Sequence, residues 1–405
     1  MVPLARPARL RALSSPVKRI LAHSLLFGLS FSIADLLFNF YLVSMGYGTD
    51  TAGLMSTISR GAGMLLGVPM GMLIDRMGAQ RSLVVALAIY CAGWLLMLQA
   101  SLLWALAAAQ FVIGAAFLMA MTAVIPLLSA VTNDDERARV FGFNASATLT
   151  VGLVGSAIGG LLPTAAALLL AVGNQTTAAY RLALGAVIVL ALGAMLPVLR
   201  RFPVVSCSET QRNSEQHNEP ATLLPLARLL RFALAGLMLG MGGGALLPFQ
   251  NLFFRNVFGL SDSVVGMILA ITALGMGMGA LMGSPVTARI GLRRAAAILR
   301  MGTVVGLMLM LIPALMPAIV GFFLRGMFVS ASFPMNDALI MRHTPARQRG
   351  MAMSLVSVLW AGGWAVSAVI SGYVQMAWGF TPIIIFAAVA YTLSALAIIT
   401  LKVDE

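Results

Sequence analysis

The sequence predicts an all-α membrane protein with twelve transmembrane helices in two pseudo-symmetric six-helix bundles. Three observations support this fold class. The chain of 405 residues is 60% apolar and only 10% charged, with a mean hydropathy of +0.96. The apolar residues fall into twelve separate runs, and the two halves of the chain resemble each other.

The composition excludes a soluble domain, because so few charged residues cannot cover that much apolar surface. Soluble domains carry roughly 25% charged residues, and disordered chains are poorer in apolar residues. One span takes about 20 residues, so this length accommodates twelve spans with short connections. The two cysteines are too few for a disulfide framework.

The twelve apolar runs are long and do not alternate in polarity, which indicates helices and not the strands of a barrel. Their approximate bounds are 20–45, 51–74, 82–100, 103–130, 140–162, 178–199, 229–254, 262–284, 295–316, 318–341, 350–373 and 380–401.

The positive residues predict the orientation. The net charge is +13, which in a soluble protein would suggest a nucleic-acid partner. Here most Lys and Arg lie in every second loop, so the positive-inside rule places both termini in the cytoplasm. The exceptions are Arg60, Arg181, Arg255 and Arg325. We expect a multi-pass protein of the plasma or inner membrane, monomeric in the bilayer, with no nucleic-acid partner.

The longest polar stretch divides the chain at its midpoint. It contains three prolines and shows no apolar period, which is typical of a flexible linker. The domain prediction is an N-terminal six-helix bundle over 1–199, a cytoplasmic linker over 200–227 and a C-terminal six-helix bundle over 228–405.

The two halves align at an offset of about 213 residues, and such a duplication of six helices is typical of transporters. Substrate sites in such architectures lie between the repeats, near the middle of the membrane. The matching residues are Phe40-Tyr41 with Phe253-Phe254, Gly53 with Gly266, and Arg76, Gly78 and Arg81 with Arg289, Gly291 and Arg294.

The loop after the second run carries a recognisable motif. Residues 71–81 read GMLIDRMGAQR, and residues 284–294 of the second half read SPVTARIGLRR. The first copy resembles the G-x-x-x-D-R-x-G-x-R-R signature of the major facilitator superfamily and departs from it only at Gln80. The second copy lacks the first Gly and the Asp.

The resemblance implies a gating role for this loop. In that family the Asp, here Asp75, faces the N-terminal end of the eleventh helix, here near Gly350, when the site opens outward. A helix N-terminus stabilises a carboxylate. An ordinary positive-inside loop with a stray Asp is the alternative. The candidate gating residues are Gly71, Asp75, Arg76, Gly78, Arg81, Arg289, Gly291 and Arg294.

The fifth run carries closely spaced glycines that are similar to a pattern of the family's drug antiporters. Residues 152–160 read GLVGSAIGG, with Ser156 in place of the central Pro. Small residues at this spacing also serve plain helix packing. The pattern and the 27 methionines, which suit adaptable apolar surfaces, favour efflux.

Ionisable residues inside the membrane are functional candidates by default, because each costs a few kcal/mol. Asp35 and Arg60 lie about 14 Å below the outer surface, near the midplane. Arg325 and Asp337 share the tenth run. The resemblance implies that Asp35 and Arg325 face each other across a central cavity. A fixed Asp35–Arg60 ion pair is the alternative, and Asp337 has an alternative partner in Arg342.

Polar residues on the same helices complete the candidate pathway for substrate or protons. Asn39 lies one turn beyond Asp35 and shares its face. The others are Gln110, Gln250 and Asn251. Each also fits a role as a hydrogen-bonding contact between helices. Trp360 and Trp364, four residues apart, fit either a cavity wall or the core.

The sequence contains no nucleotide-binding loop, catalytic constellation or metal-spaced His/Cys cluster, so we expect neither an enzyme nor a cofactor. The prediction is a secondary active transporter that moves a small organic molecule by alternating access, as proton-coupled efflux. Uptake or uniport of a small anionic metabolite is the alternative, supported by Arg60 and Arg325. A non-transporting membrane sensor on the same fold is the alternative of another class.

Overall fold

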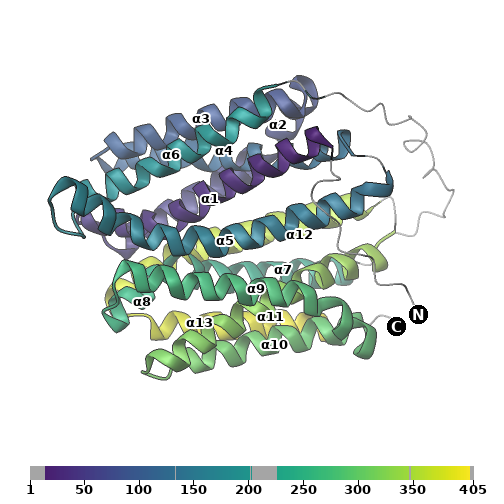
Figure 1. Cartoon of the computed structure of the whole chain (residues 1–405). Coiled ribbons are helices and arrows are strands. Elements are labelled where there is room, and N and C mark those ends of the chain that lie inside the picture. Colours follow the sequence, from purple (N-terminus) through teal and green to yellow (C-terminus); the bar gives the residue numbers. More distant parts are fainter. Residues whose placement is uncertain (1–13, 133, 201, 203–225, 346–347, 402–405) are drawn as a thin grey trace.

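The computed structural model describes residues 14–132, 134–200, 202, 226–345 and 348–401, and these ranges form helices and no strand. Figure 1 shows two groups of helices, one from purple to teal and one from green to yellow. The predicted all-α class is confirmed. Most of the expected linker, residues 201 and 203–225, lies outside the described residues.

The N-terminal bundle follows the first six apolar runs. Helices are the expected form of such runs, because each one satisfies its backbone hydrogen bonds internally. Its elements are α1 (Ser15–Ser44), α2 (Thr49–Met77), α3 (Ala79–Gln99), α4 (Leu103–Ala130), α5 (Asp134–Leu170) and α6 (Thr177–Leu199).

The C-terminal bundle follows the last six runs. Its elements are α7 (Leu226–Leu246), the short 3₁₀ helix η3 (Leu247–Phe249), α8 (Gln250–Phe258), α9 (Asp262–Ile290), α10 (Leu292–Met310), α11 (Leu315–His343), α12 (Arg349–Trp378) and α13 (Thr381–Ile399).

The repeat seen in the sequence is also present in the helices. Helices α2 and α9 are both 29 residues long. Each ends on a glycine, Gly78 or Gly291, with φ of 83° and 81°. Only glycine adopts such angles readily, so the duplicated glycine permits the same tight turn in both halves.

Three elements differ from the expected runs. The seventh run is broken at Pro248, and not in the glycine run 242–244, which stays helical within α7. Helix α5 is 37 residues long and extends beyond its apolar run, because its polar first turns continue the helix. Eleven helices of the described chain are long and apolar enough to cross a membrane. Helix α10 is not among them, since its 19 residues include three arginines.

The two bundles meet along two helix pairs. Helix α2 packs against α12, and α5 packs against α9. Helices α3 and α6 lie on one outer side of Figure 1, and α10 and α13 lie on the other. We call the end with the α1–α2 turn, residues 45–48, the Gly46 end. The opposite end, with the α2–α3 turn at Gly78, is the Gly78 end.

Candidate functional site

Asp35 and Arg60 come together near mid-depth in the N-terminal bundle. Asp35 is exposed although its neighbours Ala34 and Leu36 are only 5% and 1% exposed. Arg60 on α2 is exposed as well. The two side chains interact electrostatically, yet no nitrogen–oxygen pair between these two described residues lies within 4.0 Å. The fixed ion pair of Asp35 with Arg60, which was the alternative prediction, is therefore not formed.

Arg60 is held by the opposite bundle. Its guanidinium carbon lies 4.6 Å from the ring centroid of Trp364 and 5.8 Å from that of Trp360. Both tryptophans are on α12, four residues apart, so they share one helix face. A cation over an indole face is attracted by about 0.5–2 kcal/mol. The stack therefore draws the guanidinium towards α12.

Glycines of α7 position Trp364. A side chain on Gly243 would meet the Trp364 ring, and one on Gly244 would meet the Trp364 backbone. Trp364 is 7% exposed, and within the described part of the chain its indole nitrogen has no hydrogen-bond partner. The glycine run thus serves close packing of α7 on α12.

Aromatic rings flank the charged pair on both sides. Phe31, one turn before Asp35, stacks on Phe117 of α4 with ring centroids 4.5 Å apart. In the other bundle the rings of Phe333 on α11 and Trp360 have centroids 6.5 Å apart. Phe333 is 39% exposed. Aromatic residues are therefore found one turn from Asp35 on α1 and against Arg60 on α12.

The predicted residues Asn39 and Asn251 bind each other across the two bundles. Asn39 donates to the Asn251 side-chain oxygen at 2.9 Å and to the Pro248 carbonyl at 2.5 Å. Asn251 donates to the Leu36 carbonyl at 2.6 Å. Both amides thus take part in closing the Gly46 end. Gln250, the first residue of α8, is half-buried beside them.

Three further side chains close the same end, and of these the sequence singled out only Arg255, as an exception to the positive-inside pattern. Tyr180 of α6 donates to Asp262 of α9 at 2.5 Å, and Arg255 of α8 donates to the Tyr180 hydroxyl at 3.1 Å. Arg255 also lies 3.5 Å from Asp262 and 4.7 Å from the Phe40 ring centroid. The sequence signal that could have indicated this contact is a charged residue at the edge of an apolar run, as Arg255 and Asp262 are.

Helix-to-helix hydrogen bonds complete this closure, and backbone carbonyls accept them. Thr49 donates to Gly372 at 2.9 Å, Thr57 to Ala365 at 2.6 Å and Ser263 to Gly160 at 3.1 Å. The bundles approach so closely here that a side chain on Gly160 would meet the backbone of α9 at Asp262 and Gly266.

Arg325 does not lie against Asp35. It is 2% exposed and donates to the Tyr391 hydroxyl of α13 at 2.7 Å, inside the C-terminal bundle. Asp337 is exposed on α11. Gln110 is half-buried on α4, and its side-chain oxygen has no partner among the described residues. The structure thus brings together Asp35 with Arg60, and Asn39 with Asn251, but not the remaining candidates.

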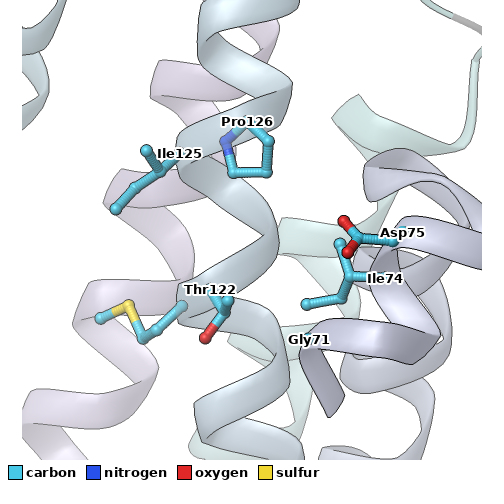
Figure 2. A pocket seen from close by; sticks show the side chains of 7 residues that line it. Gly71, Ile74, Asp75, Thr122, Ile125 and Pro126 are labelled. Carbon is cyan, nitrogen blue, oxygen red and sulfur yellow. The ribbon is translucent and has the colours of Figure 1, made fainter. Parts of the chain in front are cut away.

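The Gly78 end contains a hollow of about 530 Å³ between α2 and α4. Figure 2 shows Ile74 and Asp75 pointing from α2 towards Thr122 and Pro126 on α4. Asp75 is exposed, and open space lies where side chains on Gly71 or Gly350 would stand. The expected approach of Asp75 to the start of α12 is therefore not made in this conformation.

The remaining loop residues lie at the surface, and the departure from the family signature has a structural role. Gln80 donates to the carbonyls of Val198 and Arg200 at 2.8 and 2.9 Å, and its oxygen accepts from the Phe202 amide at 3.2 Å. It thus attaches the α2–α3 turn to the end of α6. The exposed arginines of the two loops are Arg76, Arg81, Arg289 and Arg294.

The profile of the Major Facilitator Superfamily matches residues 20–234 and again 232–405. This chain belongs to the Major Facilitator Superfamily. The two matches correspond to the duplicated helices. No curated protein is similar enough in sequence to match the chain.

Solved structures with the same fold include transporters. The D-xylose–proton symporter has a TM-score of 0.75 at 14% identity, covering 96% of this chain and 98% of its own. A bacterial homologue of the iron transporter ferroportin, in an inward-facing state, has a TM-score of 0.73 at 15% identity. The alignment covers 97% of this chain and 99% of the homologue. A mutant of the nucleoside transporter NupG has a TM-score of 0.73 at 13% identity, and the alignment covers 96% of this chain and 100% of NupG. The chain therefore has the fold of these transporters.

Proposed function

We propose that this chain is a secondary active transporter that moves a small organic molecule by alternating access, as proton-coupled efflux with Asp35 as the proton carrier. The observation that carries the proposal is the exposed Asp35 carboxylate at mid-depth, beside Arg60 but not paired with it. A charge at that depth is costly. It is retained where a proton or a substrate repeatedly replaces its partner.

Alternating access is supported by the contrast between the two ends. Hydrogen bonds between the bundles gather at the Gly46 end, whereas the Gly78 end has the hollow beside an exposed Asp75. In the other state of the transport cycle, the hydrogen bonds at the Gly46 end would separate and the start of α12 would approach Asp75. In our orientation the Gly78 end and both termini are cytoplasmic, and the protein works as a monomer.

Efflux is favoured by the fifth-run glycines, because their spacing is similar to a pattern of the family's drug antiporters. Gly159 packs on Ile33 and Leu36 of α1, and Gly160 packs on α9 of the other bundle. Small residues permit such close approach, so this stripe is where the bundles would move on each other. Uptake or uniport of an anionic metabolite is the second candidate, favoured by the exposed guanidinium of Arg60.

The test is proton release on ligand addition to the purified full chain in weakly buffered detergent. Lipophilic cations, amphiphilic drugs and small organic acids are screened with wild type, Asp35→Asn and Asp50→Asn, a control carboxylate in the first turn of α2. We expect a ligand that displaces a proton from wild type and Asp50→Asn, but not from Asp35→Asn. Binding without proton release, equal in all three, would exclude Asp35 as carrier. A complete lack of binding would favour the non-transporting sensor.

A further inference from the structure

We propose that the substrate is a zwitterion with an aromatic body, bound by its cationic group at Asp35 and by its anionic group at Arg60. This inference rests on the proposed function, because it places the substrate at the same mid-depth site. It goes further by naming the chemistry of both ends and of the middle of the molecule.

The unclosed pair is the first step of the argument. An aspartate and an arginine that can reach each other in a low-dielectric site form a short, charge-assisted contact. Asp35 and Arg60 interact through space, but they stand more than 4.0 Å apart. Arg60 is instead drawn to the Trp364 face on the other bundle. A small molecule that lies between Asp35 and Arg60 and carries one positive and one negative group would find a partner for each group.

Charge balance is the second step. A charge at membrane depth that has no partner is penalised by a few kcal/mol. A monocation at Asp35 would leave Arg60 without a carboxylate, and a monoanion at Arg60 would leave Asp35 without a cation. A zwitterion compensates both. This distinguishes the class from the simple cations or anions that either residue alone would suggest.

The aromatic surroundings are the third step. Phe31, one turn before Asp35 on α1, stacks on Phe117. Trp360, whose ring centroid is 5.8 Å from the Arg60 guanidinium carbon, packs on Phe333. Aromatic rings pack well on one another in offset or edge-to-face geometry. Trp364 itself presents its ring face to Arg60, with the ring centroid 4.6 Å from the guanidinium carbon.

The experiment compares probes that share an aromatic ring and differ in which charged groups they carry. Calorimetry on the full chain in detergent measures the binding of tryptophan, tryptamine and indole-3-propanoate, and of the matching set phenylalanine, phenethylamine and 3-phenylpropanoate. We expect the zwitterion of a set to bind about tenfold or more tightly than both of its singly charged relatives. Equal or tighter binding by a singly charged probe, or no binding by either zwitterion, would overturn the proposal.

Variants assign the two ends. Asp35→Asn should remove the preference for the zwitterion over the anion, and Arg60→Gln should remove its preference over the cation. Controls are Asp50→Asn and Arg231→Gln, whose guanidinium donates to the Thr400 carbonyl away from the site, and both should keep the wild-type order. An unchanged order in Asp35→Asn and Arg60→Gln would place the probes elsewhere and refute the assignment.

The outcome is separable from the test of proton coupling. Zwitterion binding without proton release would leave the substrate class standing and remove Asp35 as the proton carrier. Proton release by a lipophilic cation, with no binding of either zwitterion, would support the transporter and refute the substrate class.

Discussion

The hydroxyl of Tyr180 in the N-terminal bundle donates a 2.5 Å hydrogen bond to Asp262 in the C-terminal bundle, and Arg255 lies against both. Tyr180 is 0% and Asp262 is 7% exposed. A buried carboxylate with two partners from different elements is a strong link. The closed Gly46 end therefore depends on a contact that must separate if that end opens.

Removal of this contact should favour opening of the Gly46 end. Tyr180→Phe leaves Asp262 with one partner fewer, at a cost of about 1–3 kcal/mol for the closed form. We expect the ratio of closed to open form to fall by about fivefold or more. The measurement is the distance distribution between spin labels at Asn174→Cys and Met316→Cys, in a background without Cys91 and Cys207.

Tyr41→Phe is the matched control, because the Tyr41 hydroxyl donates to the Met97 carbonyl within one bundle. Its distances should remain those of the parent. A distribution for Tyr180→Phe identical to the parent would show that this hydrogen bond does not hold the end closed.

The stack of Arg60 on Trp364 should depend on the planar guanidinium. Arg60→Lys keeps the charge but loses the flat group, so the cation–π contribution of about 0.5–2 kcal/mol falls. We expect altered tryptophan fluorescence in Arg60→Lys and weaker binding of the ligand identified in the proton-release screen. Arg231→Lys is the control, and fluorescence equal to wild type in Arg60→Lys would argue against the stack.

Close packing of α7 on α12 should make Gly244 intolerant of a side chain. The added methyl of Gly244→Ala would overlap the Trp364 backbone, and overpacking costs about 1–3 kcal/mol. We expect the melting temperature in detergent to fall by several degrees. Gly185→Ala, where open space surrounds the new methyl group, should melt like wild type. Equal melting of the two variants would contradict the packing.

Asp75→Asn should favour the conformation described here. The carboxylate is exposed in this state, whereas the family resemblance gives it a helix N-terminus as partner in the opposite one, worth about 0.3–1 kcal/mol. We expect spin labels on Leu199→Cys and Met341→Cys, two exposed positions of the two bundles at the Gly78 end, to report more of the separated form there. Asp50→Asn should leave that distribution unchanged, and a shift towards the closed form in Asp75→Asn would refute the gating role.

The fold was predictable from sequence because composition, apolar runs and the repeat all depend on local residue types. Asp35 and Arg60 were found because a charge inside an apolar run stands out. Their surroundings were not predictable, since helix rotation and inter-bundle contacts are set by packing. Arg325 illustrates this limit: its own helix face points to Tyr391. Asp262 was overlooked because an acidic residue at a helix start resembles an ordinary cap.

The carbonyl acceptors at the Gly46 end have a thermodynamic consequence. Gly160, Ala365 and Gly372 lie inside helices, so their oxygens already serve the helix and offer only a second lone pair to Ser263, Thr57 and Thr49. When the bundles part, these oxygens keep their first hydrogen bond, and only the small hydroxyls need water. This hydroxyl part of the seal is therefore cheap to break and to remake, which suits the repeated opening that the proposed transport cycle requires.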